Sequence, residues 1–150
     1  MRISTKGRYG LRLMTDLAIH YGKKHVTLKD ISKRQAISEK YLWHLVPPLK
    51  SAGLISAGRG AHGGYSLAKP PSKITLKQIV TTLEGSLCPV ECVGNPAVCK
   101  RARMCASRDV WQEIGSKIEG ILAGITLEEM AERQLDKSKG AVSGASMYYI

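Results

Sequence analysis

Three segments in the first half of the chain carry apolar residues at the spacing of amphipathic helices. The first begins near Tyr9, and the second and third follow Thr27 and Ser38, whose hydroxyls are placed to cap them. The expected buried stripes are Tyr9, Leu13, Leu17 and Tyr21 in the first helix and Tyr41, Leu42, Leu45 and Leu49 in the third. Since the last two helices are joined by a short turn, the pattern predicts a helix-turn-helix.

Two consecutive prolines interrupt the third helical pattern. Pro47 and Pro48 each lack the backbone N–H that a helix interior uses, which costs about 3 kcal/mol per residue. We therefore expect the third helix to end or distort at this point.

A glycine-rich hairpin is expected directly after the third helix. Residues 54–57 and 65–67 have the composition of two strands, and the loop 58–64 between them contains four glycines. Behind a helix-turn-helix this hairpin is a wing, although an ordinary surface hairpin has the same pattern. In the wing, Arg59 supplies a guanidinium for a phosphate or a minor groove. The glycines that would let the backbone approach a phosphate chain are Gly60, Gly63 and Gly64.

The outer face of the third helix carries the residues that we expect to meet DNA. If Leu42 and Leu45 face the core, Trp43 and His44 face outward, where they are placed to touch base edges, thymine methyls or sugars in a major groove. The residues assigned to phosphate contacts are Ser38, Lys40 and Tyr41. The alternative is that Trp43 packs under the wing or against a partner chain.

The second half of the chain predicts further helices. Thr75 is placed to cap a helix with the apolar stripe Leu76, Ile79, Val80 and Leu83. Farther on, apolar residues recur at steps of three and four, which indicates a helix that pairs with its copy in a homodimer, or else one that packs into the chain's own core. These residues are Trp111, Ile114, Ile118, Ile121 and Ile125. Thr126 then begins a short helix, and a tail rich in Gly, Ser and Ala follows.

Together these patterns predict a mainly α fold with a small β wing. A winged helix-turn-helix domain is expected at residues 1–70. Residues 71–135 are expected to hold a cysteine loop and the dimerisation helices, and residues 136–150 to form a flexible tail.

Charge separates the two halves of the chain. Residues 1–69 hold thirteen of the 23 Lys and Arg but only three acids, whereas residues 70–150 hold ten bases and nine acids. A basic front half suits a polyanion such as double-stranded DNA. No apolar run approaches the roughly 18 residues of a membrane span, and the start lacks a signal-peptide core, so we expect a cytoplasmic protein without a membrane partner.

All four cysteines lie in one short stretch with the spacing Cys88-x3-Cys92-x6-Cys99-x5-Cys105. In the cytosol disulfides rarely persist, so clustered cysteines favour metal binding or redox chemistry. The paired Cys-x2-Cys knuckles typical of zinc sites are absent, and the surrounding bases would offset the charge of a thiolate-bound cluster. An iron–sulfur cluster, zinc, a redox thiol switch and inert thiols are the four interpretations.

Several motifs in order resemble a bacterial family of winged-helix transcription regulators that includes IscR, NsrR and CymR. They are the start Met1 to Gly10, Ile37-Ser38-x-x-Tyr41-Leu42, Gly53-Leu54-Ile55, and Arg59-Gly60-x-x-Gly63-Gly64-Tyr65. The resemblance covers residues 1 to about 130. It implies a homodimer on a pseudo-palindromic operator, with an iron–sulfur cluster (2Fe–2S or 4Fe–4S) as the sensed ligand in many members. IscR relatives often have Glu and Gln where this chain has Trp43 and His44, so their base preference is not carried over.

The resemblance also implies which cysteines bind the cluster. Three cysteines of the cluster-binding members align with Cys92, Cys99 and Cys105. The fourth ligand of IscR, a histidine, is replaced here by Arg108, and the acid that NsrR takes from the partner chain is replaced by Arg8. Our first candidate for the fourth ligand is Cys88, followed by Glu91, Asp109 and Asp16 of the partner subunit.

Two other classes of protein compete with a cluster-dependent regulator. One is a cofactor-free winged-helix repressor of the CymR type, or a regulator switched by zinc or thiol oxidation. The other is an enzyme or electron carrier. We predict no enzyme, because the sequence contains no nucleotide-binding loop or paired carboxylates, and its four histidines are scattered.

Overall fold

Helices dominate the computed structural model, which describes residues 2–146 and the side chains as far as residue 143. The helices are α1 (Thr5–Ile19), α2 (Leu28–Gln35), α3 (Glu39–Ser51), α4 (Leu76–Glu84), α5 (Glu91–Gly94), α6 (Ala106–Gly124) and α7 (Leu127–Ser146). The strands are β1 (Ile55–Gly58) and β2 (Gly64–Leu67), and a 3-10 turn, η1 (Pro71–Lys73), follows them. The predicted class, mainly α with a small β wing, is confirmed.

Side-chain caps begin the helices where the sequence predicted. Thr27 accepts a hydrogen bond from the Asp30 N–H at 3.1 Å, and Ser38 accepts one from the Tyr41 N–H at 3.2 Å. Thr75 forms a full capping box with Gln78 at the start of α4. Each cap satisfies a backbone donor that has no partner within its own helix.

The core of the helix-turn-helix lies between α1, α2 and α3. Leu13 and Leu17 of α1, Ile31 of α2, and Leu42 and Leu45 of α3 are all buried in one cluster. α4 and the first turn of α7 close it from the other side. Tyr21 was predicted to be buried in this core, which is wrong. α1 ends at Ile19, and the Tyr21 ring is exposed.

The prediction that α3 ends at Pro47 and Pro48 is wrong. The helix runs through both prolines to Ser51. The carbonyls that lose a donor belong to Trp43 and His44, which lie on the exposed face where water can hydrogen-bond them. Leu45 and Leu49, buried on either side of the prolines, hold the two ends in line.

The wing is an antiparallel hairpin with Ile55 opposite Leu67 and Gly58 opposite Gly64. Strand β2 of the wing also pairs with the segment before α2. The backbones of Val26 and Tyr65 exchange two hydrogen bonds of 2.8 Å. The wing is therefore fixed to the start of α2 as well as to α3.

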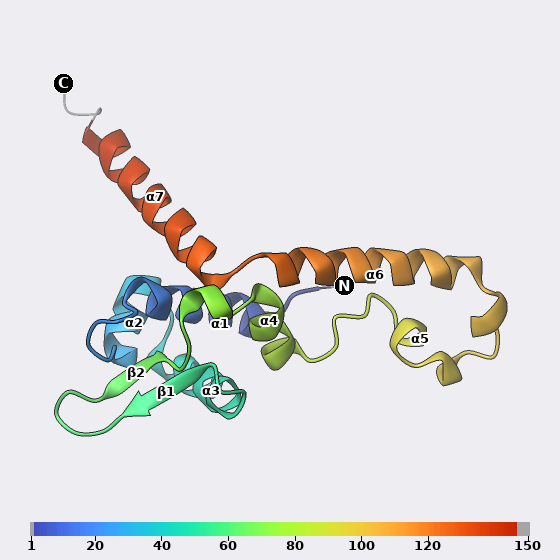
Figure 1. Cartoon of the computed structure of the whole chain (residues 1–150), viewed down its shortest axis with the longest axis horizontal. Coiled ribbons are helices and arrows are strands. Elements are labelled where there is room, and N and C mark those ends of the chain that lie inside the picture. The colour runs from blue at the N-terminus through green and yellow to red at the C-terminus, as the bar shows by residue number, and fades with distance from the viewer. Residues whose placement is uncertain (1, 147–150) are drawn as a thin grey trace.

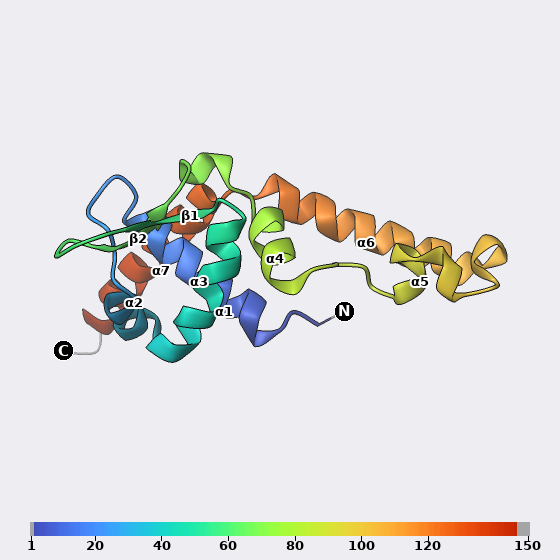
Figure 2. The ribbon, with the colours of Figure 1, turned by 90° about the horizontal axis from the view of Figure 1, so that it is seen from below.

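An arm formed by α6 and the cysteine loop projects from this body (Figure 1), and the second view shows them extending in the same direction (Figure 2). At its base, the Leu76 N–H donates to Ile125 O and the Leu127 N–H to Ile74 O. Within α6 only Gly115 is buried, packed against Pro89. Of the predicted stripe, Trp111, Ile114 and Ile121 are 42%, 38% and 63% exposed. Ile118 and Ile125 are half-buried, so most of the stripe does not pack into the chain's own core.

The last helix is longer than the sequence indicated. α7 continues to Ser146, so residues 136–146 of the expected flexible tail are helical. The remaining residues of that tail, 147–150, lie outside the described residues. No helix within residues 2–146 is long and apolar enough to span a membrane.

Candidate nucleic-acid interface and cysteine loop

The exposed face of α3 presents most of the side chains expected to meet DNA. Lys40, Trp43 and His44 are exposed, and Trp43 is 58% accessible. Ser38 uses its side-chain oxygen as the N-cap of the helix. Tyr41 is only half-buried and packs edge-to-face on Tyr9 of α1, with ring centroids 5.4 Å apart.

The wing loop presents Arg59 to solvent. Two of its glycines are needed for the fold of the wing, not only for the predicted close approach to a phosphate chain. Gly64 has a φ of +139°, and a Cβ there would lie 2.6 Å from Val26 O. A Cβ at Gly63 would lie 2.9 Å from the carbonyls of Gly58 and Gly60. These two glycines are required by the fold of the wing itself. Gly60, with a φ of +90° and open space around it, leaves the loop tip accessible.

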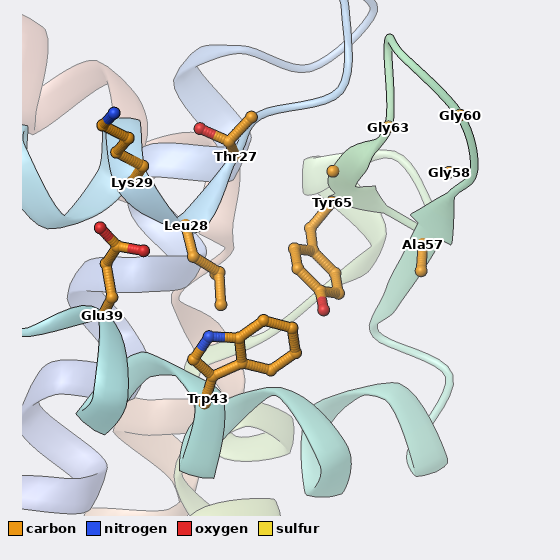
Figure 3. Close-up of a pocket in the computed structure, with 11 residues that line it drawn as sticks. Thr27, Leu28, Lys29, Glu39, Trp43, Ala57, Gly58, Gly60, Gly63 and Tyr65 are labelled. Atoms are coloured by element: carbon orange, nitrogen blue, oxygen red, sulfur yellow. The ribbon is translucent and has the colours of Figure 1, made fainter.

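A hollow of about 380 Å³ lies between the start of α2, the first half of α3 and the wing (Figure 3). Trp43 and Tyr65 point toward one another across it, with ring centroids 6.5 Å apart and planes at 87°. Gly60, Gly63 and Gly64 line the same hollow. The fold thus brings the predicted Trp43 and the wing glycines together. Trp43 also contacts the wing, as the alternative interpretation expected, while most of its ring stays exposed.

A carboxylate from α4 holds the start of α1. Glu84 Oε1 accepts hydrogen bonds from the Ser4 N–H at 3.0 Å, the Ser4 hydroxyl at 2.6 Å and the Gly7 N–H at 2.9 Å. A Cβ at Gly7 would overlap Glu84 Oε1 and one at Gly10 would overlap Leu83 Cδ1, so a methyl group at either position would displace the α4 side chain. Glu84 is the last residue of α4, so the cysteine loop starts directly beside this contact.

Asp16 is buried within the helix-turn-helix and is not available as a cluster ligand, which corrects one of the sequence-based candidates. Its carboxylate, 2% exposed, accepts two hydrogen bonds from Arg34 at 2.7 and 3.0 Å and one from Gln35 at 3.0 Å. The hydrogen bond to Asp16 raises the pKa of the Arg34 guanidinium. This network ties α1 to the end of α2.

The four cysteines are free and half-buried, and they lie along the loop between α4 and α6. Cys92 belongs to α5, and Cys88 packs beside the same short helix, since a Cβ at Gly94 would lie 3.1 Å from Cys88 Sγ. Cys99 follows a 3-10 turn, and Cys105 directly precedes α6. Within the described residues, no three His, Cys, Asp or Glu side chains are gathered closely enough to hold a metal ion. The donor chemistry fits a cluster, whereas this arrangement of the loop does not enclose one.

Arg108 connects the cysteine loop with α6. Its Nε donates to the Cys92 carbonyl at 2.9 Å, and Nη1 donates to Gln112 Oε1 at 3.3 Å. The side chain thereby fastens the cysteine loop to the first turns of α6.

A winged helix-turn-helix in the basic half of the chain, with a projecting helix that carries an exposed apolar face, defines the class as a DNA-binding transcription regulator. The comparisons agree. The family model Rrf2, described as an iron-dependent transcriptional regulator, matches residues 3–133. The chain belongs to the Rrf2 family.

Two named relatives represent the family. The transcriptional regulator CymR of Bacillus subtilis is 41% identical over 131 residues, which is 87% of this chain and 90% of CymR. IscR of Photorhabdus laumondii is 37% identical over 134 residues, which is 89% of this chain and 81% of IscR. The solved structure of CymR, the global cysteine regulator of B. subtilis, superposes with a TM-score of 0.76 over 89% of this chain and 98% of CymR. These relatives are named regulators and not enzymes.

Two contacts were not predicted from the sequence: the one between Glu84 and the start of α1, and the one between Trp43 and Tyr65. Glu84 meets Ser4 across 80 positions of the chain, and no local pattern announces such a pairing. Tyr65 was predicted in the returning strand and belongs to the family motif, but it was not predicted as a contact of Trp43. The available signal was its position in the strand directly after the wing glycines. Side chains of a strand alternate between the two faces of a hairpin, so Tyr65 lies on one face of the wing.

Proposed function

We propose that this protein is a homodimeric regulator of a pseudo-palindromic operator, and that an iron–sulfur cluster in the cysteine loop controls its DNA binding. The observation that carries the proposal is how the loop is attached. It begins next to Glu84, which holds the start of α1, and it ends at Cys105, where α6 begins. A cluster that reorders this loop therefore acts on the DNA-binding body and on the arm together.

The apolar face of α6 supports the dimer. Trp111, Ile114 and Ile121 are exposed along one helix at a/d-type spacing. A second copy of α6 would bury this face and relate two recognition helices by a two-fold axis, as a palindromic operator requires. DNA binding is assigned to residues 1–70, and cluster binding and dimerisation to residues 71–135.

Cys92, Cys99 and Cys105 are the proposed cluster ligands, with Cys88 as the fourth. Cys92 lies within α5 and Cys88 packs beside it, and metal sites commonly close only when the metal binds. A bound cluster would supply iron that reacts with oxidants or nitric oxide. The chain's own contribution is the loop, whose release would alter the spacing of the recognition helices.

Iron analysis of single cysteine variants tests the cluster. Protein purified without oxygen should be brown and contain iron and sulfide. Replacing Cys92, Cys99 or Cys105 by alanine should abolish the iron, while Met104→Ala, an exposed position in the same loop, should retain it. Full iron occupancy in any of the first three variants contradicts the ligand assignment. Full occupancy after Cys88→Ala removes only the fourth ligand and leaves Glu91 and Asp109 as candidates.

Salt dependence tests the DNA-binding function. If each subunit neutralises about three or four phosphates, a plot of the logarithm of the affinity against the logarithm of the salt concentration should have a slope of about −6 for the dimer. Fluorescence anisotropy with a labelled duplex measures this slope. A flat dependence would contradict phosphate binding by the basic half.

A cofactor-free regulator is the second candidate. One observation favours it: the similarity to CymR covers 90% of the length of CymR. Colourless, iron-free protein whose DNA binding is unaffected by chelators and oxidants supports this candidate. Bound zinc, or DNA binding that is lost reversibly on oxidation, would indicate a zinc or thiol switch.

A further inference from the structure

The hollow between α3 and the wing has walls that suit one part of a DNA duplex. Its apolar surface comes from Leu28, Trp43, Ala57 and Tyr65. Lys29 and Glu39 lie together at the end remote from the wing (Figure 3). The charge in the hollow is thus balanced, and the wall between the two aromatic rings is apolar.

The position of the hollow determines what reaches it. A recognition helix enters a major groove, and a wing carrying an arginine suits the neighbouring minor groove. The sugar–phosphate strand that separates these two grooves must then pass between α3 and the wing. In this protein the hollow occupies that place (Figure 3).

Chemistry selects between the parts of that strand. A phosphate alone would favour a purely cationic lining, whereas this lining has one lysine, one acid and a largely apolar remainder. A deoxyribose presents apolar C–H groups, which pack well on aromatic rings such as Tyr65. Lys29, in the first turn of α2, is exposed at the rim, where the adjoining phosphate would lie.

We propose that the hollow binds one sugar–phosphate unit of the strand between the two grooves. Tyr65 packs on the deoxyribose, and Lys29 binds the adjoining phosphate. The edge-to-face contact with Tyr65 also fixes the Trp43 indole, whose exposed face stays free for the major groove. The inference rests on the proposed DNA-binding function and adds Lys29 and Tyr65 to its contact residues.

Lys29→Ala tests the phosphate contact. It should weaken binding to operator and random duplexes by the same factor. It should also make the salt slope shallower by about 2 per dimer, about one unit for each hollow. Lys73→Ala, an exposed lysine in η1 that does not line the hollow, is the matched control and should leave the slope unchanged.

A single uncharged methylphosphonate, moved along the duplex, locates the contact. At one backbone position the wild type should lose affinity while Lys29→Ala loses none, because their shared interaction is already absent. If the losses add at every position, Lys29 does not contact a phosphate and the proposal is overturned. The proposal also fails, while the DNA-binding function stands, if the wild type has a steep salt slope and Lys29→Ala has the same slope.

Tyr65 is tested by two substitutions. Tyr65→Phe keeps the ring and should retain affinity within about twofold, whereas Tyr65→Ala should lose affinity on both duplexes. In a Trp111→Phe background, Trp43 is the single tryptophan, and its emission should change when Tyr65 becomes alanine but not when it becomes phenylalanine. Equal affinities of Tyr65→Ala and the wild type would remove Tyr65 from the site.

Discussion

Replacing Glu84 by alanine should loosen the start of α1 and lower the free energy of unfolding by about 2 kcal/mol. The carboxylate accepts three hydrogen bonds, two from Ser4 and one from Gly7. Breaking a hydrogen bond to a charged group costs about 1.5–3 kcal/mol. The total stays near the cost of one bond, because the freed groups are exposed or only part-buried. The Ser4 hydroxyl also remains as an N-cap for the Lys6 N–H at 3.1 Å.

Thermal unfolding followed by circular dichroism at one fixed protein concentration measures this loss. For a chain of this size, about 2 kcal/mol corresponds to a Tm lower by about 4–8 °C. Glu84→Gln keeps an acceptor without the charge and should lose about half as much. Glu132→Ala, an exposed carboxylate on α7, is the matched control and should stay within about 0.5 kcal/mol of the wild type.

Two results would refute the reasoning. One is a Glu84→Ala variant whose stability lies within about 0.5 kcal/mol of the wild type, since the three bonds would then contribute nothing net. The other is an equal loss in Glu132→Ala, since the effect would then reflect overall charge.

Further substitutions test packing, the Asp16–Arg34 ion pair and base recognition. Gly10→Ala should destabilise by about 1–3 kcal/mol in urea unfolding because its Cβ overlaps Leu83, whereas Gly140→Ala, with open space around it, should not destabilise. Arg34→Ala should cost about 2–3 kcal/mol, less than the roughly 3–5 of a fully buried pair because Arg34 is partly exposed; an unchanged urea midpoint contradicts this. Trp43→Ala and His44→Ala should reduce the preference for operator over random duplex more than they reduce random binding, and equal losses in competition assays would exclude base contacts.

The local pattern of the sequence determined the elements of the DNA-binding half. Thr27, Ser38 and Thr75 begin helices where their hydroxyls can reach the free backbone donors of the first turn. The wing follows from two strand-forming segments on either side of a glycine loop. The cysteine stretch was likewise visible from the close spacing of its four thiols. Each of these signals depends on a few neighbouring residues, so it can be recognised in the sequence alone.

Tertiary structure decided the features that depend on distant partners. α3 passes through Pro47 and Pro48 because buried neighbours on both sides outweigh the lost hydrogen bonds. Asp16 forms an ion pair with Arg34, and Glu84 accepts hydrogen bonds from the start of α1. Neither contact follows from the spacing of residues in the sequence. The Trp43–Tyr65 hollow likewise exists only because the wing folds back over α3. Local hydrogen bonding fixes where helices and strands begin, whereas the site depends on which surfaces remain after the core is packed.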